Sequence, residues 1–184
     1  MTMRKTILAT ALLLVSTHTL AQNDPNSPTI MSNFNYEYVE ARFGASPATI
    51  GAAISKSIHP NAYMIARVDS EFESDFDLAA GFGFNAPMNN WADLTGEMLF
   101  RVQDKREYRR AETGMELSLG IRQWLGPQLE VGGKGGYISI NDEDEWIGSV
   151  YARFHSTELF SLGLEARIND AYKEQLMLTA RFKY

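Results

Sequence analysis

The sequence has no cysteine, only three histidines, and no long apolar run after its first twenty residues. Without cysteine the chain can form no disulfide, no thiolate metal site and no thiol nucleophile. Without a second apolar run of about 20 residues, any further contact with a membrane has to come from strands. The formal net charge is −6, so there is no basic excess to bind phosphates, and we expect no nucleic acid partner.

The single long apolar run, Thr6–Val15, follows Arg4 and Lys5 and is followed in turn by the small-x-small sequence Thr19-Leu20-Ala21. This run is shorter than the roughly 20 residues that a membrane-spanning helix needs. It has the layout of a cleaved secretory signal peptide, which we assign to residues 1–21. Residues 22–33 are polar and broken by proline, which predicts a disordered periplasmic lead-in. The remaining residues, 34–184, form one domain.

The end of the chain shows the pattern that repeats throughout this domain. Residues 176, 178, 180, 182 and 184 are apolar or aromatic, whereas Thr179, Arg181 and Lys183 alternate with them. Such alternation predicts a strand with one apolar and one charged face. Similar stretches, separated by turn residues, continue from an expected first strand at 34–43 to the end, with a turn expected at 85–90. We count about ten strands of roughly 9–12 residues, with eight as the alternative, and no helical period.

The fold class is therefore all-β, an up-and-down antiparallel barrel, and four features place it in a membrane. The signal peptide exports it, and a final strand that stops on an aromatic residue needs a closing partner. The connections also alternate between two kinds. Tight turns, which we assign to the periplasm, are expected at 59–62, 85–90, 125–128 and 155–158. Charged links are expected between them, at 70–75, 104–110, 141–145 and 169–173. Aromatic residues at strand ends suggest two girdles, as in membrane barrels. One would contain Tyr36, Tyr63, Phe84, Trp91, Trp124, Phe154, Phe160 and Tyr184.

Charged residues occupy the other face of these strands. A Lys or Arg that faces lipid at mid-bilayer costs roughly 2–4 kcal/mol, so these groups must face the lumen. They could line a selective pore, or they could pair with one another and fill the lumen. The predicted lumen-facing network consists of Glu40, Arg42, Asp93, Glu97, Arg101, Glu116, Arg122, Glu130, Lys134, Arg153, Glu165, Arg167 and Arg181.

We predict no catalytic residues, no cofactor and no metal site, and hence no enzyme. After removal of the signal peptide, the histidines are His59 and His155, and both fall in turns on the periplasmic side, away from an extracellular active site. The acidic link at 142–144 is typical of solvated charge, or of weak Ca²⁺ or Mg²⁺ bridging to lipopolysaccharide. The run at 132–136 is rich in glycine, but no Ser or Thr follows its lysine, so it indicates close packing of strands.

The signal peptide, the strand at 114–122 and the ending at 180–184 together resemble small Gram-negative outer-membrane β-barrels, the porin-like class that includes OmpX- and OmpA-type barrels. The resemblance implies contact with outer-membrane lipid and lipopolysaccharide. It also implies insertion by the barrel assembly machinery, with Phe182 and Tyr184 as the assembly signal. That class usually ends in Phe, from which Tyr184 departs. The ten-stranded proteases of the class carry Asp and His on tall loops, and the links here are short and lack His.

Three functions follow from this interpretation. The first is a non-enzymatic outer-membrane barrel with an ion-paired lumen, which serves envelope structure or surface interaction. The second is a narrow porin-like channel for small solutes or ions. The third, from a different class, is a soluble periplasmic β-barrel that binds an apolar ligand.

Overall fold

The structure is a computed structural model, which describes residues 32–71, 75–104, 111–141, 143–170 and 173–184. The predicted signal peptide and most of the predicted lead-in lie outside the described residues. In the described ranges, no helix is long and apolar enough to cross a membrane. The described residues form ten strands: β1 (Tyr38–Ala45), β2 (Ala48–His59), β3 (Ala62–Glu71), β4 (Asp75–Asn89), β5 (Ala92–Asp104), β6 (Glu112–Trp124), β7 (Leu129–Ile140), β8 (Glu143–His155), β9 (Phe160–Asp170) and β10 (Lys173–Lys183).

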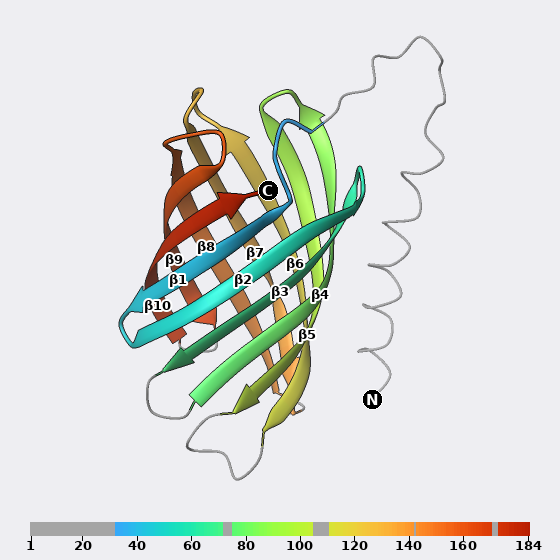
Figure 1. Cartoon of the computed structure of the whole chain (residues 1–184). Coiled ribbons are helices and arrows are strands. Elements are labelled where there is room, and N and C mark those ends of the chain that lie inside the picture. Colours follow the sequence, from blue (N-terminus) through green and yellow to red (C-terminus); the bar gives the residue numbers. More distant parts are fainter. Residues whose placement is uncertain (1–31, 72–74, 105–110, 142, 171–172) are drawn as a thin grey trace, which may run out of the picture.

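The strands form a closed barrel (Figure 1). Each strand pairs antiparallel with its neighbours in the chain, and β10 pairs antiparallel with β1. In this closing pair Val39 lies opposite Phe182 and Phe43 lies opposite Leu178. The predicted up-and-down topology, with ten strands and a closing partner for the last one, is confirmed. We call the end of the barrel where β1 begins and β10 ends the terminal rim, and the other end the opposite rim.

The two faces of the strands differ sharply in exposure. On the outside, Leu117, Leu162 and Leu178 are 45%, 44% and 52% exposed. On the inside, Glu116, Arg167 and Arg181 are 0%, 6% and 8% exposed. Apolar side chains on the outside and charges on the inside are what a barrel surrounded by lipid requires. A soluble barrel that binds an apolar ligand would have the reverse arrangement.

Several predicted boundaries are wrong, among them the charged link at 141–145, because β8 begins at Glu143 and pairs there with β7. The first strand begins at Tyr38 and not at Phe34, because residues 32–37 leave the sheet at the terminal rim. Most of the turn expected at 85–90 is instead strand: β4 continues to Asn89 and still pairs with β5 at Pro87, opposite Asp93, which leaves the turn at residues 90–91. A shift of register between Pro87 and Asn89 accommodates the proline, which has no N–H to donate.

The aromatic girdle at the terminal rim is also smaller than expected. Trp91, Phe154 and Tyr184 are about half exposed, as residues at a lipid–water interface would be. Tyr36 and Tyr63, however, are buried, and Trp124 is packed against the buried cluster that contains them. These three residues therefore do not belong to the girdle.

A test of the outward face uses two positions on β6 that both point outward, Leu117 near the middle of the strand and Gln123 near its end. Leu117→Arg should lower the free energy of unfolding by about 2–4 kcal/mol, because the charge would lie in hydrocarbon, whereas Gln123→Arg should cost only about 0–1 kcal/mol at the interface. Denaturant titration of the protein in lipid bilayers measures both. Equal costs at the two positions would contradict the assignment of this face to lipid.

Candidate functional site

The lumen contains the predicted charged residues. The structure places every member of the predicted network on the inner face, where each is buried or half-buried. All of them except Asp93 take part in ion pairs with other described residues. The pairs form two connected groups, and each group links strands that are not neighbours in the wall.

Arg101 is the centre of the larger group. Its side chain is fully buried and pairs with Asp77, with Glu116 at 3.1 Å and with Asp170 at 2.7 Å. Glu116 also accepts from Arg67 and lies 3.5 Å from the Lys134 ammonium. One arginine thus connects β4, β5, β6 and β9 across the lumen.

Asp69 extends this group to the strands near the closing seam. Its carboxylate lies 3.1 Å from Arg42 and 3.3 Å from Arg167. Arg167 in turn lies 3.1 Å from Asp170 and 3.2 Å from Glu165. We call the whole set the Arg101 network; its members are Arg42, Arg67, Asp69, Asp77, Glu97, Arg101, Glu116, Lys134, Glu165, Arg167 and Asp170.

The smaller group, the Glu40–Glu130 network, links β1, β6, β7, β8 and β10. Glu40 accepts from Arg181 at 2.8 Å and from Arg153 at 3.0 Å. Arg153 also lies 3.6 Å from Glu130. Glu130 then contacts three more side chains, which are Arg122 at 3.0 Å, Tyr151 at 2.7 Å and His155 at 3.0 Å.

Several members of the two networks were not among the predicted site residues. Arg67, Asp69 and Asp77 alternate with outward apolar residues of β3 and β4, so the parity that identified their neighbours could have identified them. His155 was expected in a turn, but it is the last residue of β8, and its buried ring contacts Glu130. The sequence signal for this residue is its parity with Arg153, which also faces the lumen.

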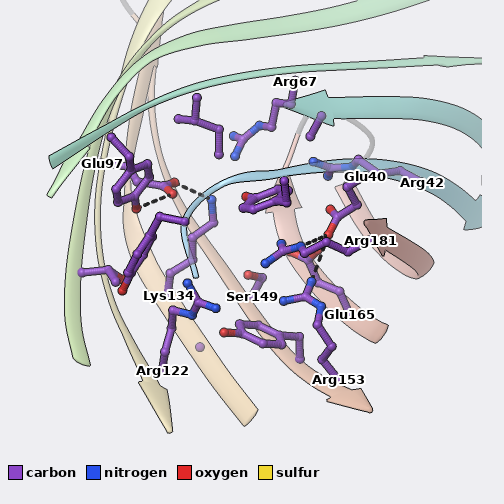
Figure 2. A pocket seen from close by; sticks show the side chains of 18 of the residues that line it. Glu40, Arg42, Arg67, Glu97, Arg122, Lys134, Ser149, Arg153, Glu165 and Arg181 are labelled. Carbon is purple, nitrogen blue, oxygen red and sulfur yellow. Dashed lines mark hydrogen bonds and ion pairs between the residues drawn. The ribbon is translucent and has the colours of Figure 1, made fainter. Parts of the chain in front are cut away.

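An internal cavity of about 110 Å³ lies where the two networks approach each other (Figure 2). Tyr38, Tyr63 and Tyr151 are among the hydroxyl-bearing side chains of its wall. The charged part of the wall has seven cationic residues but only three carboxylates: Arg42, Arg67, Arg122, Lys134, Arg153, Arg167 and Arg181 against Glu40, Glu97 and Glu165. Partners such as Asp69, Glu116 and Glu130 do not line the cavity. The cavity wall is therefore positively charged, although the lumen as a whole contains many acids.

The tyrosine rings that reach into the lumen lie against glycines of the neighbouring strand. The Tyr63 ring covers Gly83, and the Tyr151 ring covers Gly132 in the glycine-rich part of β7. A Cβ atom at either glycine would overlap the ring. The glycines therefore provide the space in which large aromatic side chains fit between the charged residues.

Asp93, the remaining predicted residue, lies near the terminal rim. Its carboxylate accepts hydrogen bonds from the hydroxyls of Tyr36, at 2.8 Å, and Ser32. It thus holds the segment that precedes β1 rather than a cation. Among the described residues, no group of three or more His, Asp or Glu side chains is arranged to hold a metal ion.

Comparisons with known proteins identify the fold and no closer relationship. No protein-family model matches the chain, and no curated protein matches it. Among solved structures, the KdgM porin is 7% identical with a TM-score of 0.51, and 80% of this chain and 99% of that chain are covered. The outer-membrane protein Omp33 of Acinetobacter baumannii is 8% identical with a TM-score of 0.42, and the match covers 81% of this chain and 98% of that chain. The chain has the fold of outer-membrane porins.

A test of the Arg101 network compares two of its cations. Arg101→Gln should destabilise the barrel by about 3–5 kcal/mol, because it leaves Asp77 and Glu116 buried with less compensating charge. Lys134→Gln should cost clearly less, because the Lys134 side chain is 26% exposed and its charge is partly solvated. Denaturant unfolding of both variants in detergent micelles gives the comparison. The network would not brace the wall if the two substitutions had the same small effect.

Proposed function

We propose that this protein is a narrow porin-like channel of the outer membrane that favours small anions. The observation that supports the proposal most directly is the excess of cations around the internal cavity. The closed barrel with its apolar exterior supports the membrane location, because a sheet in hydrocarbon must satisfy all its backbone hydrogen bonds internally. The same proposal includes insertion by the barrel assembly machinery through Phe182 and Tyr184, and contact with outer-membrane lipid and lipopolysaccharide.

The cavity wall has the chemistry that anions require. Guanidinium groups present several N–H donors in a plane and bind carboxylate or phosphate oxygens at two points. Here Arg153 and Arg181 meet at Glu40 (Figure 2). Arg153 and Arg122 both lie near Glu130, so that three arginines face two carboxylates. A wall with excess positive charge attracts anions and repels cations.

The size of the cavity limits the solute. A volume of about 110 Å³ holds only a few water molecules, so a small anion fits and a folded or branched solute does not. A structure of the KdgM porin, which shares this fold, is a complex with disordered oligogalacturonate, a sugar carboxylate. That complex supports an anionic class of solute for a barrel of this fold, while the dimensions of the present lumen support smaller members of the class.

A second candidate is a static barrel that serves envelope structure or surface interaction. The ion pairs around Arg101 favour it, because side chains that bridge β4, β5, β6 and β9 brace the wall and obstruct the lumen at the same time. Neither candidate requires an enzymatic step. The two differ in whether ions cross the barrel.

Conductance in planar bilayers tests the proposed function. We expect discrete openings, and a reversal potential in a salt gradient that shows a preference for chloride over potassium. Lys134→Gln removes one cation of the cavity wall and should lower the anion-to-cation permeability ratio by about two- to threefold, as expected for one unit charge several ångströms from the ion path.

Lys56→Gln is the matched control, because Lys56 is an exposed residue of β2 that does not line the cavity. It should leave the permeability ratio unchanged. A folded, heat-modifiable protein that shows no openings would favour the static barrel. Openings with a preference for cations would contradict the anion channel.

A further inference from the structure

Residues 32–37, which precede β1, lie inside the terminal rim of the barrel. Phe34 and Tyr36 point into the lumen and are 6% and 7% exposed, whereas Asn35 between them is exposed. These residues are not part of any strand, so the ladder of the sheet does not hold them. Their burial comes from the side chains that surround them in the mouth of the barrel.

Aromatic contacts hold the segment in place. The Phe34 ring stacks on Trp124 of β6 with the ring centroids 5.4 Å apart, and the Tyr36 ring stacks on Tyr63 of β3 at 4.8 Å. The Arg122 guanidinium lies 4.7 Å from the centroids of both the Phe34 and the Tyr36 ring. The segment therefore contributes to a packed aromatic cluster with a cation against it.

Polar contacts attach the segment to two further strands and one turn. The Tyr36 hydroxyl donates to Asp93 of β5 at 2.8 Å, and the Ser55 hydroxyl of β2 donates to the Tyr36 carbonyl oxygen at 2.7 Å. The Asn33 amide donates to the Asn90 carbonyl oxygen at 2.9 Å, in the turn between β4 and β5. The contacts reach β2, β3, β5 and β6, which together form about half of the wall at this rim.

The segment also forms part of the cavity wall. Tyr36 and Arg122 both line the cavity, so at this end the cavity is bounded by the segment itself. We propose that residues 32–36 are a built-in plug, which closes the terminal end of the lumen when docked and opens it when released. The mouth of the barrel is thus a docking site whose occupant is the chain's own N-terminal segment.

Release is physically accessible because the plug is short and lies outside the hydrogen-bonded sheet. Segments of this kind open locally without unfolding the elements that they cover. Release would also remove two aromatic rings from Arg122, a cation that remains paired with Glu130. The mouth would then become wider, and both Arg122 and the Asp93 carboxylate, which now accepts from Tyr36, would be uncovered.

Thiol labelling tests the plug without any need for conductance. The chain has no cysteine, so Ser55→Cys provides a single thiol, at a residue that is 1% exposed and contacts the plug. In the folded parent this thiol should react slowly with a charged methanethiosulfonate reagent. Adding Phe34→Ala and Tyr36→Ala should raise the rate by more than about tenfold, because both anchoring rings are lost.

Three controls distinguish the plug from general loosening. Asn35→Ala, in the same segment but exposed, should leave the labelling rate of Ser55→Cys unchanged. A thiol at the other end of β2, Thr49→Cys, should keep its own rate in the double alanine variant, because Thr49 lies towards the opposite rim. Heat-modifiable migration shows that each variant is folded. Should the double variant not fold, deletion of residues 22–36 behind an intact signal peptide replaces it.

Rapid labelling of Ser55→Cys in the parent, or the same rate with and without the two rings, would overturn the plug. Channel recordings add a second measurement that rests on the proposed function: the double variant should open more often than the parent or the Asn35→Ala protein. A barrel that does not conduct in any variant but shows the labelling difference would refute the channel and retain the plug. A conducting barrel with no labelling difference would support the channel and refute the plug.

Discussion

The pairing of β1 with β10 is the contact on which the rest of the structure depends. Backbone N–H and C=O groups in hydrocarbon find no water, so an unpaired edge strand would cost several kcal/mol for each free group. Closure removes both edges, and the antiparallel register from Tyr38 opposite Lys183 to Gly44 opposite Met177 does so over the length of β1. Once the sheet is closed, every side chain must face either lipid or lumen.

The closed sheet then decides where charge can go. Alternate residues of each strand face the lumen, and acids and bases placed there have few partners except one another. Each network meets this need by linking distant strands, as when Arg101 of β5 joins Asp77 and Asp170. The pairs are not symmetric about the cavity: cations such as Arg42 line it, while carboxylates such as Asp69 lie behind them. A lumen that is nearly balanced in charge can in this way present a positive surface.

The sequence predicts the parts of this structure that depend on alternation. Parity alone separates Glu116 from Leu117, and it supports the topology and the direction of both faces. It does not predict which acid meets which base, because that depends on the register of strands far apart in the chain. Tyr36 and Trp124 share the parity of the inward residues Glu40 and Arg122, but aromatic residues near strand ends are also typical of a girdle, and that interpretation placed both at the lipid interface. The contacts of this segment with the wall, Phe34 on Trp124 and Tyr36 on Tyr63, join residues far apart in the sequence and are visible only in the structure.

The same lumen has to hold the barrel wall together through ion pairs and, in a channel, to leave a path open for solute. Ion pairs that hold the wall together must stay in place, so a path for solute cannot depend on breaking the Arg101 network. The structure separates the two demands by position: buried pairs join the strands to one another, whereas the terminal end is covered by a segment that belongs to no strand. Arg122 connects the two regions, since it pairs with Glu130 of the wall and lies against the rings of Phe34 and Tyr36. Movement of the segment therefore changes the surroundings of one cavity cation while the rest of the wall stays paired.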